Sequence, residues 1–240
     1  MIQMELYNSF NLKEKEVISI VGGGGKTTTL FMLADELKKL GKRVLVTTTT
    51  AIFNPKEEEY DHYFLGKIDD FTPNKGSITI LGDRVEKGKL KAASLGEIER
   101  IVGEGLFDYL LIEADGAKGK PIKAPDSYEP VIPKSTTKTI GVIGLDSLDR
   151  RVEDIVHRPE RFIEITKTQY PDIIDVEIMV NLILHPRGLF KGARGERILL
   201  LNKACNEYYA LKGKEVRRAL FKKGFKGRIL LADIRTKKFY

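Results

Sequence analysis

Short apolar runs alternate with longer amphipathic stretches along most of this chain. The apolar runs are rich in β-branched residues and predict strands over residues 17–21, 43–47, 109–112, 139–145, 197–202 and 228–232. Apolar positions at helical spacing predict helices over residues 27–40, 95–102, 159–167, 175–184 and 214–223. Strands that are apolar throughout and separated by helices are typical of a parallel sheet covered on both faces. We therefore expect an α/β fold, a three-layer sandwich with a mainly parallel sheet.

One region departs from this alternation. Residues 62–65 and 77–85 have the pattern of short strands, and glycines at positions 82 and 88 supply turns. This predicts a small antiparallel insertion, which could form a lid or an edge ribbon. The chain shows no internal repeat and no linker-like stretch, and 240 residues suit one α/β domain with an insertion. We therefore expect residues 1–240 to form a single domain.

A glycine-rich loop connects the first predicted strand to the first predicted helix. The loop and the start of the helix consist of Gly22, Gly23, Gly24, Gly25, Lys26, Thr27 and Thr28. Glycines let consecutive backbone N–H groups approach a phosphate, and the helix N-terminus adds a partial positive charge. Lys26 would reach the β- and γ-phosphates, and the Thr27 hydroxyl would bind Mg²⁺. The pattern predicts a P-loop (Walker A motif) for a nucleoside triphosphate; the alternative is a turn that only permits close packing.

The type of P-loop stays open. Ile20 stands where the standard pattern G-x-x-x-x-G-K-[ST] has its first glycine. The shorter form G-x-x-G-K-[ST] fits residues 22–27 and resembles the loop of Mur ligases. The second hydroxyl, at Thr28, resembles the loops of signal-recognition-particle and nitrogenase-iron-protein relatives, although the signature lysine of the latter falls on Val21.

Two carboxylates follow the apolar strand over residues 109–112. Glu113 and Asp115 are two positions apart, so the alternation of a strand points both side chains to the same side. This resembles a Walker B motif, in which one carboxylate holds Mg²⁺ and the other orients or deprotonates the attacking nucleophile. We expect a metal site of Thr27, Glu113 and Asp115 and a catalytic set of Lys26, Glu113 and Asp115. The alternative for the two acidic residues is to cap a following helix.

Basic residues follow the predicted strands over residues 109–112 and 139–145. They are Lys118, Lys120, Lys123, His157 and Arg158. A connection that leaves a parallel strand starts on the ligand face of the sheet, so these side chains could bind a second anionic substrate or an acidic partner. The threonines at residues 47–50 end another strand and could face Mg²⁺ or the γ-phosphate. The alternatives are a solvated basic loop, a structural helix entry and a strand end with turn-forming hydroxyls.

The strand over residues 197–202 ends in a motif related to base recognition. Asn202-Lys203 resembles the start of the N-K-x-D motif of GTPases, with Cys205 in the aspartate position. A thiol cannot accept the two hydrogen bonds that a carboxylate takes from guanine. Asn202 and Lys203 are therefore candidate nucleotide contacts, and ATP and GTP both stay possible. An ordinary strand-terminal turn is the alternative.

Charge and composition narrow the classes of partner. A net charge of +7 favours anionic partners, yet 41 basic against 34 acidic residues is a modest excess spread along the chain. Aromatic residues make up 8% and do not alternate with basic ones, so we expect no nucleic-acid partner. No stretch resembles a membrane span or a secretory leader, and Cys205 is the only cysteine. We expect a cytoplasmic protein with no membrane contact, disulfide or thiolate metal site.

Five stretches of the chain carry a family resemblance. They are residues 22–29, 47–50, 113–125, 129–133 and 157–159. Together they resemble the YqeC family of selenium-dependent hydroxylase accessory proteins, and the resemblance spans most of the chain. It implies a cytoplasmic P-loop protein that assists the maturation of selenium-dependent molybdenum hydroxylases, such as enzymes similar to xanthine dehydrogenase. The implied partner is a client protein, either the molybdenum hydroxylase itself or its maturation machinery.

The motifs and the resemblance together favour a Mg²⁺-dependent NTPase with ATP or GTP as its nucleotide. Binding or hydrolysis of the nucleotide would drive an assembly step. Two alternatives stay open. One is Mur-ligase-like or kinase-like transfer of the γ-phosphate to an acceptor, and the other is a nucleotide-gated scaffold with negligible turnover.

Overall fold

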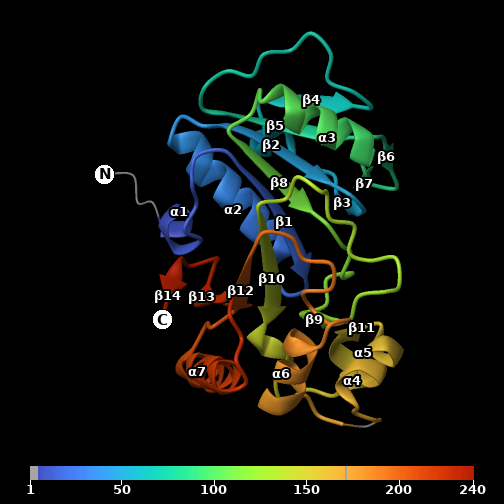
Figure 1. Ribbon diagram of the computed structural model, residues 1–240, viewed down its shortest axis with the longest axis vertical. Coiled ribbons are helices and arrows are strands. Elements are labelled where there is room, and N and C mark those ends of the chain that lie inside the picture. The colour runs from blue at the N-terminus through green and yellow to red at the C-terminus, as the bar shows by residue number, and fades with distance from the viewer. Residues whose placement is uncertain (1–4, 171) are drawn as a thin grey trace. The chain divides into compact units, whose positions relative to one another are not determined.

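The computed structural model describes residues 5–170 and 172–240, which fold into two compact units (Figure 1). Unit 1 contains the chain up to Ile20 together with Thr27–Gly116 and Val131–Lys138. Unit 2 contains Val21–Lys26, Ala117–Pro130 and Thr139–Tyr240. Both units combine helices with mainly parallel strands, which confirms the α/β class. The single domain over residues 1–240 stays a prediction.

Unit 1 is built on parallel strands. In the part of the chain that the structure describes, their order is β1 (Glu16–Gly22, in unit 1 through Ile20), β8 (Tyr109–Glu113), β2 (Arg43–Thr48), β5 (Ser77–Gly82) and β4 (His62–Leu65). β1, β5 and β8 are buried along their whole length, as expected for strands with both faces covered. The helical segments are α1 (Glu5–Ser9), α2 (Lys26–Lys39), the 3₁₀ turn η1 (Glu57–Glu59) and α3 (Leu95–Glu104).

The antiparallel insertion lies elsewhere than predicted. β4 and β5, which the turn pattern assigned to it, pair in parallel with His62 opposite Thr79. The antiparallel sheet instead has the order β3 (Ala51–Phe53), β7 (Lys89–Lys91), β6 (Val85–Glu86). A parallel pair needs a long crossover, and residues 66–76 supply it between β4 and β5. Within residues 51–91 of unit 1, the short turn around Gly88 joins β6 and β7 as a hairpin does.

Unit 2 holds a second group of strands and most of the helices. Its strand order is β10 (Lys138–Gly144), β12 (Glu196–Asn202), β13 (Arg228–Asp233), β14 (Lys238–Phe239), and a separate parallel pair consists of β9 (Ile122–Lys123) and β11 (Val156–His157). Its helical segments are η2 (Leu145–Ser147), α4 (Val152–Ile155), α5 (Pro159–Thr166), α6 (Val176–Leu184) and α7 (Glu207–Lys222). β12 and β13 are parallel, and β14 is antiparallel to β13.

Capping side chains determine where three of the described helices begin. The Ser94 hydroxyl accepts a hydrogen bond from the N–H of Glu97 at the start of α3, and Asp175 caps α6 in the same way. Asn206 caps α7, which therefore begins two turns before the predicted residue 214. Within residues 5–170 and 172–240, none of the helices combines the length and the apolar character that crossing a bilayer requires.

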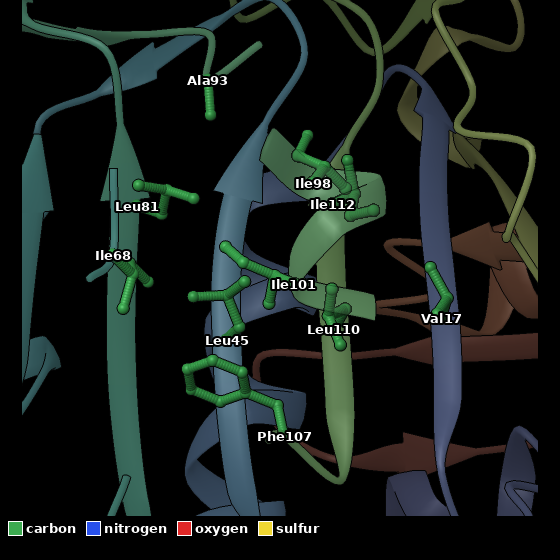
Figure 2. Close-up of a cluster of buried hydrophobic side chains, with 10 residues drawn as sticks. All are labelled: Val17, Leu45, Ile68, Leu81, Ala93, Ile98, Ile101, Phe107, Leu110 and Ile112. Atoms are coloured by element: carbon green, nitrogen blue, oxygen red, sulfur yellow. The ribbon is translucent and has the colours of Figure 1, made fainter. Parts of the chain in front are cut away.

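The core of unit 1 lies between α3 and the strands beneath it. Figure 2 shows Ile98 and Ile101 of α3 beside Leu45 of β2 and Leu110 and Ile112 of β8. All five side chains are at most 4% exposed. Because Glu113 directly follows this packed segment of β8, the core fixes the position of one predicted metal ligand.

Replacement of Ile98 by alanine tests this core. We expect Ile98→Ala to lower the free energy of unfolding by about 2–5 kcal/mol, because it removes buried methyl groups and leaves a cavity. The matched control is Leu95→Ala on the same helix, where the side chain is 43% exposed and the loss stays below about 1 kcal/mol. Urea unfolding measures both values. Equal losses for the two variants would contradict this description of the core.

Candidate functional site

The glycine loop in unit 2 is held by its own backbone and by Lys26. Lys26 is 5% exposed, and its Nζ donates a hydrogen bond of 2.9 Å to the carbonyl of Gly22. The N–H of Gly23 donates to the carbonyl of Val142 at 2.9 Å, and the N–H of Gly24 donates to the carbonyl of Lys120 at 3.1 Å. The backbone N–H groups of Gly23 and Gly24 are therefore both bonded to neighbouring backbone carbonyls. Helix N-termini are where backbone amides bind phosphate, so a phosphate role would involve the start of α2 at Lys26.

The loop requires glycine because other backbone segments lie against it. A Cβ atom at Gly22 would lie 2.3 Å from the carbonyl oxygen of Val142, and one at Gly24 would lie 2.2 Å from the N atom of Gly144. Both glycines also have positive φ angles, which L-residues with side chains rarely adopt. Close packing, the alternative in the sequence analysis, is thus a sufficient reason for these two glycines. A phosphate role has to rest on the residues that follow them.

Asn202 supports the loop from the end of β12. Its Nδ2 donates to the carbonyl of Gly24 at 2.9 Å, and its Oδ1 accepts the N–H of Ile234 at 3.1 Å. Lys203 forms a salt bridge of 2.7 Å with Oδ2 of Asp146. Both polar atoms of the Asn202 amide are engaged within the protein, so this side chain positions the loop. Contact of Asn202 or Lys203 with a base stays a prediction.

The predicted metal ligands belong to unit 1. Thr27 Oγ1 donates a hydrogen bond of 2.7 Å to Oε2 of Glu113. Glu113 is 5% exposed and Asp115 is 2% exposed, so both carboxylates are buried at the end of β8. Hydroxyl and carboxylate oxygens are the hard ligands that Mg²⁺ prefers, so the donor set fits this ion. Among the described residues no group of three or more His, Cys, Asp or Glu side chains could hold a metal, so phosphate and water oxygens would complete the shell.

The threonines of residues 47–50 bond to neighbouring backbone. The hydroxyl of Thr47 donates to the carbonyl of Leu81, and that of Thr48 donates to the carbonyl of Glu113, both at 2.8 Å. Thr49 donates to the carbonyl of Val131 at 2.7 Å. These contacts favour the structural alternative for the threonine run, in which the hydroxyls join strand ends rather than face a ligand.

Two of the predicted substrate residues bind one carboxylate in unit 2. Lys123 is 1% exposed, and its Nζ lies 2.6 Å from Oε2 of Glu129. The Arg158 guanidinium contacts both oxygens of the same carboxylate and also lies 3.3 Å from Oδ2 of Asp126. Burial would raise the pKa of Glu129, but the hydrogen bonds from Arg158 and Lys123 hold it at about 2. We call Lys123, Asp126, Glu129, His157 and Arg158 the Glu129 cluster.

His157 lies within this cluster because β11 pairs with β9. The pairing places His157 opposite Lys123, and the His157 carbonyl accepts the N–H of Ala124. Burial and the positive charges of Arg158, Lys123 and Lys118 lower the pKa of His157 to about 4. The imidazole is therefore neutral at pH 7.

Lys118 and Lys120, which the sequence analysis named as substrate residues, also lie in unit 2. So do Lys191 and Glu129, which it did not name. Lys118 is exposed, and Lys120 Nζ donates to the carbonyl of Asp154 at 2.5 Å. The Nζ atom of Lys191 donates to the carbonyls of Asp126 and Ser127 at 2.5 and 2.7 Å. The sequence analysis gave no role to Glu129; two acidic residues, Asp126 and Glu129, directly after a run of lysines were the signal that could have identified it.

The class is an α/β protein with mainly parallel strands and a candidate phosphate site. It is defined by the strand order, the glycine loop between β1 and α2, and the buried carboxylates at the end of β8. The chain matches the YqeC protein family over residues 18–160 and belongs to that family. It is 38% identical over 185 residues to "Uncharacterized protein YqeC" of Escherichia coli (strain K12), an alignment that covers 75% of this chain and 72% of the relative. The family resemblance inferred from the five stretches is thus confirmed.

The lowered pKa of His157 predicts a specific pH dependence of stability. Between pH 6.5, the ordinary pKa, and about 4, the unfolded chain binds a proton at this residue and the native protein does not. The contribution of His157 to stability is therefore complete above pH 6.5 and is lost as the pH falls toward 4. We expect the Tm of the wild type to fall relative to that of His157→Gln between pH 7 and 4.5. A difference in Tm that does not change with pH would contradict the lowered pKa.

Proposed function

We propose that this protein is a cytoplasmic, Mg²⁺-dependent P-loop NTPase that assists the maturation of selenium-dependent molybdenum hydroxylases. One observation carries the nucleotide part of the proposal: Thr27, the residue after the loop lysine, donates a hydrogen bond of 2.7 Å to the buried carboxylate of Glu113. Hydroxyl and carboxylate oxygens in this relation suit a metal that accompanies a triphosphate. Membership of the YqeC family supports the maturation role through the resemblance described above.

Each residue of the proposed site has a role that follows from its chemistry. The first-turn amides of α2 and the Lys26 ammonium would bind the β- and γ-phosphate oxygens, with Lys26 exchanging its bond to the Gly22 carbonyl for a bond to phosphate. Thr27 with Glu113 or Asp115 would hold Mg²⁺, which supplies charge neutralisation on the phosphates. The other carboxylate would orient the attacking nucleophile. Cys205 offers no carboxylate for guanine, so ATP and GTP are both included in the proposal.

Transfer to an acceptor is the second candidate function. The observation that favours it is the hydrogen bond from Gly24 N–H to the Lys120 carbonyl, because it ties the basic segment over residues 118–123 to the loop within unit 2. Phosphate release from Mg·ATP or Mg·GTP without any added acceptor would identify hydrolysis. Turnover only with an acceptor would identify transfer, and tight binding without turnover would identify a nucleotide-gated scaffold.

Replacement of Lys26 is the direct test of nucleotide binding. We expect Lys26→Ala to weaken Mg·ATP or Mg·GTP binding by at least about tenfold, because it removes a charge-assisted hydrogen bond to phosphate. Lys39→Ala is the control, since Lys39 lies at the other end of the same helix and pairs with Asp35. Calorimetry gives the affinities, and circular dichroism checks the fold. Equal affinities for wild type and a folded Lys26→Ala would end the P-loop assignment.

The two carboxylates can be tested through the Mg²⁺ dependence of binding. We expect Asp115→Asn and Glu113→Gln each to reduce the gain in nucleotide affinity that Mg²⁺ provides, because an amide is a poorer ligand for a hard cation. Glu58→Gln, at a side chain that is 72% exposed, should leave this gain unchanged. The measurement is calorimetry with Mg²⁺ and with EDTA. A full Mg²⁺ effect in both carboxylate variants would remove these residues from the metal site.

A further inference from the structure

The positive charge of this chain is concentrated in α7 and the segment that follows it. Residues 207–240 contain eleven Lys or Arg and three Asp or Glu, whereas residues 1–206 contain 30 and 31. The basic excess is thus not spread along the chain, as the sequence analysis states. A local excess of this size attracts acidic partners to the surface that carries it.

The packing of α7 in unit 2 determines which of its side chains face outward. Its buried residues are Ala210, Gly213, Val216 and Leu220, and the helix packs on β13 (Figure 1). A Cβ atom at Gly213 would lie 2.3 Å from Cδ1 of Leu231, so this side is in close contact with the strand. The opposite positions recur every three or four residues. We call them the outer face of α7: Leu211, Lys214, Glu215, Arg218, Phe221 and Lys222.

Three cations of the outer face repel one another. Lys214, Arg218 and Lys222 are each four residues from the next, so neighbouring positive charges lie one helical turn apart. Among residues 5–170 and 172–240, none of the three side chains has an ion pair or hydrogen bond. Glu215 lies 3.5 Å from Lys212. Because like charges at this spacing destabilise a helix, carboxylates of a partner would relieve a repulsion that the free protein bears.

Two exposed apolar side chains accompany these cations. Leu211 is 53% exposed and Phe221 is 62% exposed. The two are ten residues apart, which corresponds to about 15 Å along the helix axis. Aromatic residues and Arg are enriched where proteins bind one another, and such a surface needs apolar contacts as well as charge pairs.

The apolar side chains favour a protein over the other anionic partners. A nucleic-acid duplex would pair its phosphates with the cations and leave Leu211 and Phe221 in water. A helix that lies on an anionic bilayer inserts a broad apolar face, and the broad apolar face of α7 is already buried within unit 2. An acidic protein surface offers carboxylates and apolar contacts together.

We propose that the outer face of α7 is a docking surface for an acidic segment of a partner protein. Carboxylates of that segment would lie beside Lys214, Arg218 and Lys222, and its apolar side chains would cover Leu211 and Phe221. The identification of this partner with the client protein rests on the proposed function, but the binding of an acidic segment does not.

A synthetic peptide of Glu and Leu is the probe, and a matched peptide has Gln in place of every Glu. Backbone ¹H–¹⁵N NMR of the whole protein would follow each titration. We expect the Glu peptide to give saturable shifts within residues 207–223 and the Gln peptide to bind at least about tenfold more weakly. Arg218→Glu should weaken binding of the Glu peptide by a similar factor. Lys75→Glu, at an exposed lysine of unit 1, makes the same change in net charge and should leave the affinity unchanged.

Two further measurements distinguish lost docking from lost folding. Arg218→Glu places a carboxylate four residues from both Lys214 and Lys222, so we expect the Tm of the free protein to rise by about 1–3 °C while binding is lost. Phe221→Ala removes an exposed ring and should weaken binding of the Glu peptide by about fivefold with the Tm unchanged.

The outcomes separate this surface from the glycine loop. If Lys26→Ala leaves the nucleotide affinity unchanged while α7 binds the Glu peptide as described, the docking surface stands and the proposed function fails. Absence of saturable binding, or equal affinities of wild type and Arg218→Glu, would overturn the docking surface. Tighter binding of a DNA duplex or of phosphatidylglycerol vesicles than of the Glu peptide, with the same dependence on Arg218, would overturn the choice of a protein partner.

Discussion

Close backbone packing around the glycine loop is the constraint on which the rest of unit 2 depends. The loop can follow its path only because Gly22 and Gly24 let the backbone at Val142 and Gly144 approach to distances that a side chain would block. The amide of Asn202 then joins the loop to β12 and to Ile234. One loop thus fixes the relative positions of several strand ends, which is where ligands bind in parallel sheets.

Charge is distributed differently around the carboxylates of unit 1 and around Glu129 in unit 2. Around Glu113 and Asp115 the buried groups are acidic and suit a cation. Around Glu129, the Lys123 ammonium and the Arg158 guanidinium share one buried carboxylate. The Glu129 carboxylate allows this second region to be buried, because without it Lys123 would be a desolvated ammonium with a large energetic cost.

Local patterns in the sequence predicted the main strands and helices, because a strand, a glycine loop and a helix in series leave few arrangements. They also named Thr27 and Glu113 as metal ligands; the structure joins the two by a hydrogen bond, and metal binding stays a prediction. The parallel pairing of β4 with β5 could not be predicted from the sequence. A turn residue does not reveal whether the next strand returns as an antiparallel hairpin or pairs in parallel after a crossover. The role of Glu129 depends on Arg158, which is 29 residues away, and on the β9–β11 pair. The threonines at 47–50 carry hydroxyls that suit ligands and carbonyls equally, so only the tertiary contacts distinguish the two.

The packing of the glycine loop has a consequence for genetics. Alanine at Gly22 or Gly24 would collide with neighbouring backbone in the absence of any ligand, so an inactive allele at these positions would report misfolding of the loop. Strong purifying selection on the four glycines would be expected even in a relative that had stopped binding nucleotide. No neighbouring backbone forces the side chain of Lys26 to be small, so variation among relatives at this position is the better indicator of the proposed nucleotide binding.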